Sequence, residues 1–326
     1  MRVRTLPTQP HCFFFGGLDI QMHRTLELMQ GVGIDAQKLD PWSRDSDFDV
    51  LHCWSLDGIH RLAVDGAKHY NKKVVISALL PFADLRGWIR HAGALIEGRR
   101  RVQRRMARQL DLLFVHCEPQ REAAIKLFSV PAEKIEIVPT ILDPELYNHT
   151  PVPPIDDLTG YIACVGNIWP RKNQLRVAQA AKKIGCPAIF IGNAMAGEEA
   201  YTAAFAEIVD STPNFRWYKW VSEPDLRRVL SNALAIVLPS FLEVQPGAPL
   251  EGAAMGKPIL LGNKPYARQK YYQNAYIAEP TSIDSIARGI ESIRNDPTRH
   301  VPPREFILEC HPDQVSARFK RIFESL

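Results

Sequence analysis

Two glutamates flank a turn in the stretch PSFLEVQPGAPLEGAAMGKPILLG, residues 239–262. Glu243 follows the buried-strand pattern LAIVLPS, and Glu251 comes two residues after Pro249, which suits the first turn of a helix. Carboxylates accept paired hydrogen bonds from vicinal sugar hydroxyls. The two acids therefore fit a sugar nucleotide, which joins a hexose to a ribose through a diphosphate. Two ordinary first-turn acids, favoured by the helix dipole, explain the pattern equally well.

The residues between the two acids would contact the phosphates. The predicted donor-binding residues there are Pro246, Gly247, Ala248, Pro249 and Leu250, and the backbone amides of Gly247, Ala248 and Leu250 would face a phosphate. Free amides at the start of a helix attract an anion. This turn is therefore the predicted phosphate-binding segment.

A second group of charged residues follows a glycine turn in YIACVGNIWPRKN. Gly166 and Asn167 end a predicted strand, and Arg171 and Lys172 precede a predicted helix. Two adjacent cations at the mouth of a βα loop suit a diphosphate, because they offset its charge where water is partly excluded. The alternative interpretation, that these basic residues are simply solvated near the start of a helix, is also good.

A third turn contains Gly16 and Gly17, between the apolar run HCFFF and a helix predicted over residues 20–30. Small residues let backbone amides approach a ligand at the helix N-terminus. Asp19 would oppose a phosphate there, and the pattern is not GxGxxG. A tight strand–helix turn that needs small residues is about as good an interpretation as ligand binding.

Short apolar runs alternate with helical patterns along the whole chain, which predicts an α/β protein with parallel sheets covered on both faces. Helices are predicted over residues 118–128, 173–184, 224–233 and 282–294, and at the C-terminus. Strands are predicted in HCFFFG, FDVLHCWS, KVVISALL, DLLFVHCE, GYIACVGNI, PAIFIGNA, FRWYKWV, LAIVLPS, KPILLG and NAYIAEP.

Prolines at positions 144, 151, 153 and 154 predict a domain boundary. We expect two Rossmann-like domains, residues 1–150 and 151–304, that face each other across a cleft at the carboxyl ends of their sheets. Glu243 and Lys172 are expected to lie in this open cleft, so that replacing either with alanine would leave the fold intact.

Composition excludes several classes of protein. The net charge of +4 over 326 residues does not suggest general nucleic-acid binding. No apolar run approaches the roughly 20 residues that cross a bilayer. The six cysteines form no CxxC pattern, and Cys12, Cys53, Cys117 and Cys164 lie in strand-like runs, so we expect buried free thiols in a reducing cytoplasm. No metal-binding cluster is visible.

The second half of the chain resembles the donor domain of GT-B retaining glycosyltransferases of family GT4, the glycosyl transferases group 1. The segments GNIWPRKN and EVQPGAPLEGAAMGKP match the family's glycine turn with its following lysine and its E-x7-E motif. The resemblance extends over residues 111–294, and the first hundred residues match only in layout, with FFFGGLDIQ at the glycine-loop position. Asn167 replaces the family's usual arginine, and Gln245 with Pro246 replaces an aromatic–glycine pair.

The resemblance implies specific roles for the candidate residues. Many members carry a histidine where this chain has VVISALLPFADLRGW, and Asp84 is the nearest ionisable candidate there. The C-terminal segment 305–326 is expected to return to the first domain. The implied donor contacts are Lys172 and Arg171 to the diphosphate, Glu243 to the transferred sugar, Glu251 to the ribose, and the backbone near Trp220 and Val221 to the base.

The implied reaction is hexose transfer, with retention, from a nucleotide-diphosphate sugar to a glycan or a lipid-linked acceptor, in the synthesis of surface polysaccharide or glycolipid. It needs no metal or cofactor, because the cations stabilise the leaving diphosphate, which itself takes the acceptor's proton. One alternative is a non-catalytic relative that binds nucleotide sugars. Another is a nucleotide-dependent oxidoreductase, although GxGxxG is absent from both halves.

The segment GRRRVQRRMARQ places Arg101, Arg105 and Arg108 on one helical stripe, within the basic run 99–108. One hypothesis is peripheral attachment of a cytoplasmic protein to the anionic inner surface of a membrane. The alternatives are an acceptor site for an acidic substrate and a solvated basic face.

Overall fold

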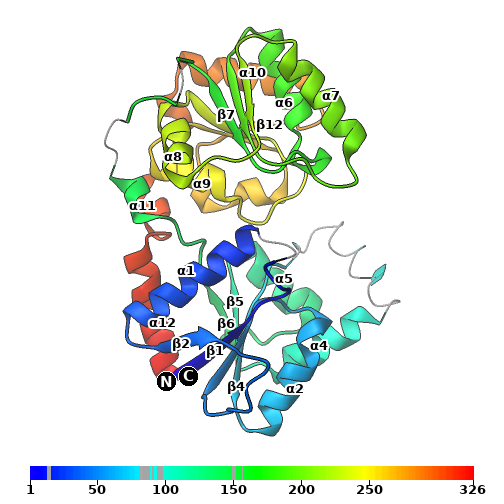
Figure 1. The fold of residues 1–326 in the computed structure, drawn as a ribbon, viewed down its shortest axis with the longest axis vertical. Coiled ribbons are helices and arrows are strands. Elements are labelled where there is room, and N and C mark those ends of the chain that lie inside the picture. Colours follow the sequence, from blue (N-terminus) through cyan, green and yellow to red (C-terminus); the bar gives the residue numbers. More distant parts are fainter. Residues whose placement is uncertain are drawn as a thin grey trace. The chain divides into compact units, whose positions relative to one another are not determined.

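The computed structural model describes residues 1–12, 16–80, 82, 89, 92–93, 98–148, 152–155 and 157–326. It contains two compact units, each built as a parallel sheet between helices (Figure 1). The N-terminal unit comprises Met1–Ile141 together with Glu309–Leu326, and the C-terminal unit comprises Leu142–Leu308. The predicted α/β class is confirmed.

The N-terminal unit has a six-stranded sheet of order β2-β1-β3-β4-β5-β6, and all of its neighbouring strands are parallel. The chain passes from β1 to β2 on one side and then to β3 on the other, so its topology reverses between β1 and β3. The strands are β1 Arg2–Leu6, β2 Asp35–Lys38, β3 Val50–Cys53, β4 Lys73–Ser77, β5 Leu112–Val115 and β6 Ile135–Ile137.

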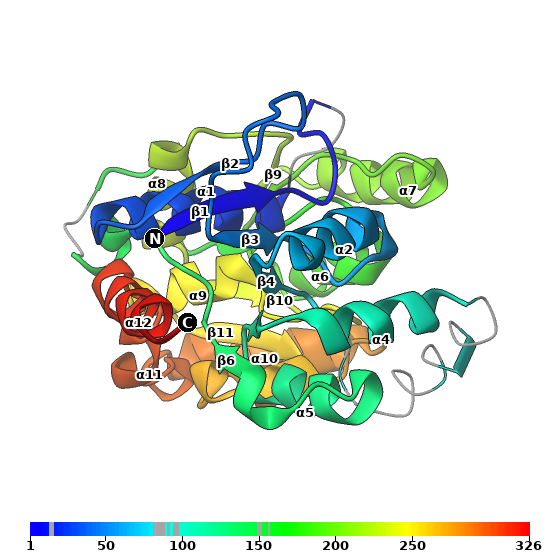
Figure 2. The same cartoon turned by 90° about the horizontal axis from the view of Figure 1, so that it is seen from below.

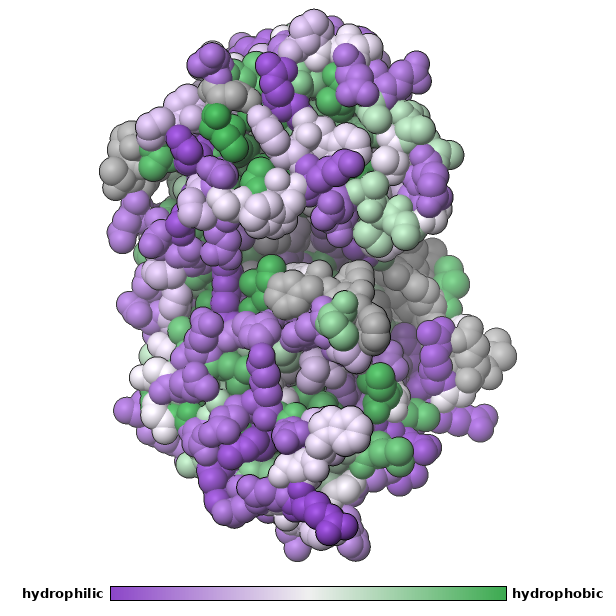
Figure 3. Space-filling model, viewed as in Figure 1, coloured by the Kyte–Doolittle hydropathy of each residue, from purple (hydrophilic) through white to green (hydrophobic). Residues whose placement is uncertain are grey.

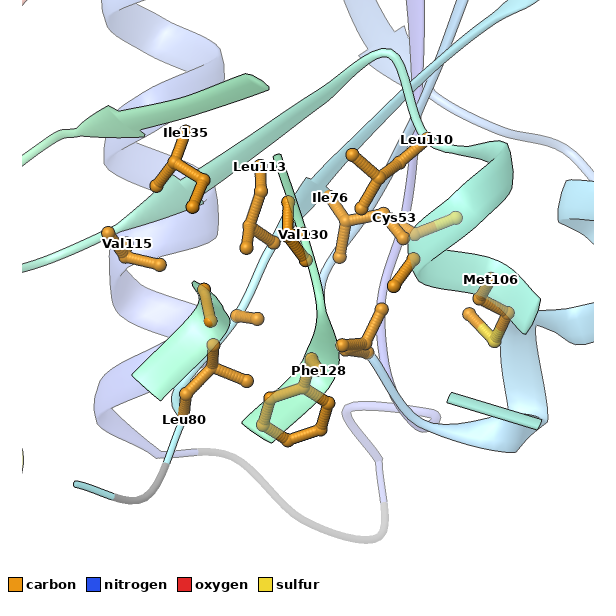
Figure 4. Close-up of a cluster of buried hydrophobic side chains, with 14 of the residues drawn as sticks. Cys53, Ile76, Leu80, Met106, Leu110, Leu113, Val115, Phe128, Val130 and Ile135 are labelled. Carbon is orange, nitrogen blue, oxygen red and sulfur yellow. The ribbon is translucent and has the colours of Figure 1, made fainter. Parts of the chain in front are cut away.

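Two sets of helices cover this sheet. Helices α1 and α12 pack against each other on one face, and α2, α4 and α5 cover the opposite face (Figure 1, Figure 2). Figure 4 shows the core under the second set, where Met106 and Phe128 of the helices meet Ile76 and Leu113 of the strands. The helices are α1 Gly17–Gly31, α2 Arg61–His69, α4 Arg99–Gln109, α5 Glu118–Phe128 and α12 Pro312–Ser325, with 3-10 turns η1 Gly58–His60 and η2 Ala132–Lys134.

The first strand differs from the prediction. It is formed by RVRTL, whereas the described part of HCFFF, His11 and Cys12, is a turn. Val3 and Thr5 of β1 are buried, and the alternating Arg4 pairs with Asp35 at 3.3 Å, so the pleat buries the apolar side chains and leaves the charges paired. Cys12 is exposed, so its predicted burial is wrong, whereas the other five cysteines are buried free thiols.

The C-terminal unit repeats the architecture with the order β12-β11-β10-β7-β8-β9, again parallel throughout. Helix α6 packs against α7 and α10, and α9 packs against α8 and α11. The strands are β7 Ile162–Val165, β8 Ala188–Ile191, β9 Phe215–Tyr218, β10 Ala235–Leu238, β11 Ile259–Gly262 and β12 Tyr276–Ala278. The helices are α6 Gln174–Lys183, α7 Glu199–Asp210, α8 Glu223–Asn232, α9 Gly247–Ala254, α10 Ile283–Asn295 and α11 Arg304–Leu308.

Each strand of this unit has four or fewer residues, most of them apolar, and is bounded by turns. All residues of β8, β10 and β11 are buried, as expected for strands with helices on both faces. Among the residues that the structure describes, no helix is long and apolar enough to span a bilayer.

Candidate functional site

The strands β7 and β10 are neighbours in the middle of the C-terminal sheet, where the chain order reverses. From β7 the chain moves to β8 on one side, and from β10 it moves to β11 on the other. Ligands of open α/β sheets bind outside the carboxyl ends of the strands at such a reversal. The loops that follow β7 and β10 contain both charged motifs of this unit.

An ion pair joins these two loops. Lys172 ends the 3-10 turn η4 Pro170–Lys172, and its Nζ lies 2.7 Å from Glu243 Oε1. Only 18% of the Lys172 side chain and 9% of the Glu243 side chain are exposed. Each charge is therefore largely screened from water by the surrounding loops.

Gly166 makes room for the lysine. Its φ of +145° is one that side chains other than glycine rarely adopt, and a Cβ there would lie 3.4 Å from Lys172 Cε. Gly192, at the end of β8, approaches the same turn, and a Cβ on it would lie 2.3 Å from Gly166 O. The two glycines let the β7 turn close over the stem of Lys172.

Two buried amide side chains fix the loop after β7. Gln174 Nε2 donates to the carbonyl oxygens of Gly166 at 2.9 Å and Asn167 at 2.7 Å. Asn173, with φ of +69°, donates from Nδ2 to the carbonyl oxygen of Pro280 at 2.7 Å. Our sequence analysis missed both residues. Asparagine at the start of a predicted helix is typical of an N-cap, but the Asn173 side chain does not cap α6 in the structure.

The loop after β10 is fixed by the segment that follows β11, which forms the 3-10 turns η5 Pro265–Arg268 and η6 Lys270–Tyr272. Gln269 Nε2 donates to Val244 O at 2.5 Å, and the Tyr272 hydroxyl donates to Pro246 O at 3.1 Å. These bonds hold the backbone of the segment between Glu243 and helix α9, so residues outside this loop restrain the backbone next to Glu243.

Tyr266 supports the start of the same loop. Its hydroxyl lies 3.1 Å from Ser240 O and accepts a hydrogen bond from Gly262 N at 3.2 Å. Burial is the main reason that the pKa of Tyr266 is raised, and the charge of Glu243 adds to the shift. The phenol therefore stays protonated beside the carboxylate.

Helix α9 begins at Gly247 with Pro246 at the N-cap, and no side chain caps it. In an α-helix with this start, Leu250 is the first residue whose amide reaches an intrahelical carbonyl. The amides left for a ligand are therefore those of Gly247 and Ala248, a smaller set than predicted. A Cβ on Gly247 would lie 3.9 Å from Glu251 Oε1, so the Glu251 carboxylate turns back toward the helix start.

Arg171 and Lys172 have different neighbours. The Arg171 guanidinium carbon lies 4.1 Å from the centre of the Trp169 ring, and the indole nitrogen of Trp169 donates to Glu198 Oε1 at 3.2 Å. Successive residues of a 3-10 turn point about 120° apart, which explains why the two cations diverge. Arg171 Nε is buried and has no hydrogen-bond partner among the described residues.

The remaining candidates of this unit lie at the ends of other elements. Asn167 is exposed, and its Nδ2 lies 3.6 Å from Met195 Sδ. Trp220 is 75% exposed and Val221 is half-buried, in the loop after β9 at the edge of the sheet. Nothing in their contacts fixes a role for these three residues.

The glycine turn of the N-terminal unit is closed by its own helix. Gly16, the N-cap of α1, donates its amide to Asp19 Oδ2 at 2.8 Å, and Gly17 is the first helical residue. Asp19 Oδ1 lies 3.2 Å from His11 Nε2. A buried carboxylate thus already occupies this helix N-terminus. Asp84, the candidate for a catalytic role, lies outside the described residues.

A narrow cavity opens near the carboxyl ends of β3, β4 and β5 in the same unit. A hydrogen bond of 2.8 Å joins His52 Nε2 and Ser77 Oγ. Burial lowers the pKa of His52 to about 3, so the imidazole is neutral near pH 7. Burial also lowers the pKa of His116. The cavity is lined by Gln21, Thr25, Trp54, Ser77, Phe114, His116, Val138, Pro139, Ile141 and Phe319.

Comparisons with known proteins agree with this architecture. Models of the families "Glycosyl transferases group 1" and "Glycosyltransferase Family 4" match residues 149–305 and 23–146. The solved structure of Anabaena Alr3699/HepE in complex with UDP has a TM-score of 0.78 at 12% identity, and its complex with UDP-glucose has 0.75 at 12%, each over 100% of both chains. Sucrose-phosphate synthase (tll1590) from Thermosynechococcus elongatus has 0.77 at 13%, over 100% of this chain and 99% of that one. The sequence matches none of the curated proteins with which it was compared.

The two parallel α/β units and the matching solved structures place the protein in the GT-B fold class. The two family matches, which together cover most of the chain, then give the family: the chain belongs to the group 1 glycosyltransferases.

Proposed function

We propose that this glycosyltransferase moves a hexose, with retention, from a nucleoside diphosphate sugar to a glycan or lipid-linked acceptor in the synthesis of surface polysaccharide or glycolipid. The observation that carries the proposal is the Lys172–Glu243 ion pair, next to a helix start whose Gly247 and Ala248 amides have no side-chain cap. A cation and free amides at a strand-order reversal suit a diphosphate.

Each residue around the reversal has a proposed task. Lys172 binds the diphosphate, and Glu243 both orients Lys172 and accepts hydrogen bonds from hydroxyls of the transferred sugar. Glu251, turned toward the start of α9, accepts hydrogen bonds from the ribose. The backbone at Trp220 and Val221 borders the base.

Two further residues, Arg171 and Asp84, belong to the proposed site. Arg171 reaches the diphosphate only if it leaves the Trp169 ring. We keep it as a second diphosphate ligand that takes the place of the arginine replaced by Asn167. Asp84 keeps its proposed catalytic role in the acceptor half, which is formed by the N-terminal unit.

The proposed chemistry needs no strong base. The bond between the anomeric carbon and the phosphate oxygen breaks, the acceptor oxygen bonds to the same face of that carbon, and the acceptor's proton passes to the departing phosphate. Negative charge grows on the diphosphate during this step. Lys172 and the amides of α9 are fixed before the reaction, so they stabilise that charge without reorganising.

Uridine is the first base to test, because the similar Anabaena protein was solved with UDP and with UDP-glucose. The test is a thermal-shift screen of the full chain against UDP, GDP, ADP and their sugars. A donor that binds the folded protein raises its melting temperature, and the stabilisation grows with the logarithm of the donor concentration divided by Kd. One nucleotide with its sugar is expected to stabilise the protein, and no shift with any of them would contradict the proposal.

A second candidate function is nucleotide-sugar binding without catalysis. It is favoured by Asn167 and by the position of Arg171 on Trp169, away from the ion pair. The transferase and the non-catalytic binding protein differ in whether they slowly release the nucleoside diphosphate from the nucleotide sugar that stabilises the protein. Release that depends on Lys172 supports the transferase, and binding without any release supports the second candidate.

A further inference from the structure

Two large apolar side chains project from the beginning of α2 in the N-terminal unit. Ile59, in the turn η1, is 64% exposed, and Leu62, in the first turn of α2, is 73% exposed. Figure 3 shows hydrophobic side chains among hydrophilic ones over this helix. Val64 and Ala67 bury the opposite face of α2 in the core, so the exposed pair is not needed to hold the helix in place.

Helix α4 lies beside this pair. A Cβ on Gly58 would lie 3.4 Å from Val102 Cγ1, which places η1 against α4. One turn further along, Arg105 Nη2 of α4 lies 3.1 Å from Asp65 Oδ2 of α2. The two helices therefore present their outer faces together.

The outer face of α4 is basic. Met106 and Ala107 point into the core, as Figure 4 shows for Met106, whereas Arg101, Arg105 and Arg108 are exposed. Arg105 already pairs with Asp65 of α2. Among the residues that the structure describes, no ion pair involves Arg101 or Arg108.

We propose that this α2–α4 face, defined by Ile59, Leu62, Arg61, Arg101, Arg105 and Arg108, docks onto an anionic membrane surface. Arginines attract acidic headgroups, and their contributions add when they lie within a Debye length of the bilayer. Ile59 and Leu62 project from the same face and would enter the boundary between headgroups and acyl chains. A nucleic acid would satisfy the arginines but would gain little from two aliphatic side chains, so a lipid surface accounts for more of the face.

The proposal does not depend on the transferase activity, and its test measures binding of the full chain alone. The protein is sedimented with vesicles of phosphatidylcholine, or of phosphatidylcholine with one third phosphatidylglycerol, at low and at high salt. We expect binding to the anionic vesicles only, and weaker binding at high salt.

Two double variants separate the charges from the apolar side chains. Arg101→Glu with Arg108→Glu is expected to weaken binding by at least about tenfold, because each basic residue at an anionic surface contributes about fivefold. Ile59→Ser with Leu62→Ser is expected to weaken it by about tenfold through lost apolar burial. Unchanged melting temperatures would show that both variants are folded.

Matched controls carry the same changes elsewhere. Lys320→Glu with Arg321→Glu makes the same charge change on exposed positions of α12, and Ile277→Ser removes an apolar side chain that is 43% exposed in the C-terminal unit. Both controls should bind as the native protein does. The proposal is overturned if the native protein ignores anionic vesicles, if it binds nucleic acid instead, or if the two α2–α4 variants bind no worse than their controls.

Discussion

Helices α1 and α9 each begin after a strand of a parallel sheet, but the groups at their N-termini differ. Helix α1 follows the first strand of the N-terminal sheet, and its N-cap amide, on Gly16, is bonded to Asp19. Helix α9 follows β10 in the C-terminal sheet, and no side chain caps it. At the start of α1, an external anion would have to displace a buried carboxylate. A glycine-containing turn before a helix is therefore a poorer phosphate site where a carboxylate of that helix is already bonded to the N-cap amide, as in α1.

The two units also differ in the charged groups that lie next to these helix starts. In the C-terminal unit, the open helix start has an ion pair beside it, Lys172–Glu243. In the N-terminal unit, His11 Nε2 lies 3.2 Å from Asp19 Oδ1, so the carboxylate at that turn already has a partner. The following predictions test whether this difference decides where the nucleotide binds.

The largest effect is expected from Lys172→Ala. Release of the nucleoside diphosphate from the donor should slow by about 10²–10³-fold, since a fixed charge at the leaving group is lost. The free energy of unfolding should also fall, by about 1–3 kcal/mol, because Glu243 remains buried without its partner. Steady-state kinetics and urea unfolding measure the two effects.

A double variant separates function from stability. Lys172→Ala combined with Glu243→Gln removes both charges, so stability should recover while activity stays low. Lys182→Ala, at an exposed position on α6, is the matched control and should behave as the native protein. Full activity in the Lys172 variant would refute its assignment.

Closing the open helix start should also prevent binding. Pro246→Asp places a carboxylate at the N-cap of α9, where it can accept a hydrogen bond from a free amide of the first turn. Affinity for the nucleoside diphosphate should fall by about tenfold or more, as measured by calorimetry. Pro246→Asn caps the helix without the charge and should weaken binding less. Equal affinities for all three proteins would show that α9 does not meet the phosphates.

Burial of His52 predicts a pH dependence of stability that arises in the N-terminal unit. The pKa of His52 falls from 6.5 to about 3 on folding, because burial disfavours the charged ring. The unfolded chain therefore binds more protons below pH 6.5, and the free energy of unfolding should fall from that pH toward 3, by about 1.4 kcal/mol per pH unit for this group.

Hydrogen exchange between pH 7 and pH 5 would locate the effect in strands β3 and β4. His52→Gln should reduce the pH dependence, and His69→Gln, at an exposed position of the same unit, should leave it as in the native protein. Equal pH dependence in the two variants would show that His52 is not its source.

The smallest effect concerns the cap of α1. Asp19→Ala should lower the free energy of unfolding by about 1 kcal/mol, because the Gly16 amide loses its partner. Glu27→Ala, on an exposed position of the same helix, is the control. Nucleotide affinity should be unchanged in both variants. A gain in affinity in the Asp19 variant alone would mean that the α1 start also binds phosphate.

Much of the fold could be predicted from the sequence because buried parallel strands are continuous apolar runs. Nine of the ten predicted strands were found, and α5 has the predicted bounds. The missed strands lack that signal: β2 reads DAQK at a sheet edge, β6 has three residues, and β1 alternates arginine with buried residues. The arginines of β1 made it look like an exposed segment, because the aspartates that they contact are more than thirty residues away in the sequence.

The charged residues of the candidate site could be predicted from the sequence. The residues that hold their loops in place could not. Lys172 and Glu243 were expected near one ligand, and the structure pairs them directly. The supports came from distant segments, such as Gln269 bonded to the loop of Glu243, and such contacts leave no local pattern. The divergence of Arg171 from Lys172 depends on the 3-10 turn, which adjacent basic residues do not reveal.

The most direct test of the central claim compares a nucleoside diphosphate with its monophosphate. Calorimetry should use the base that stabilises the native protein most, and the folded double variant Lys172→Ala with Glu243→Gln. If the ion-paired lysine binds the second phosphate, the native protein prefers the diphosphate and the variant loses that preference. A variant that still prefers the diphosphate as strongly as the native protein would contradict the account.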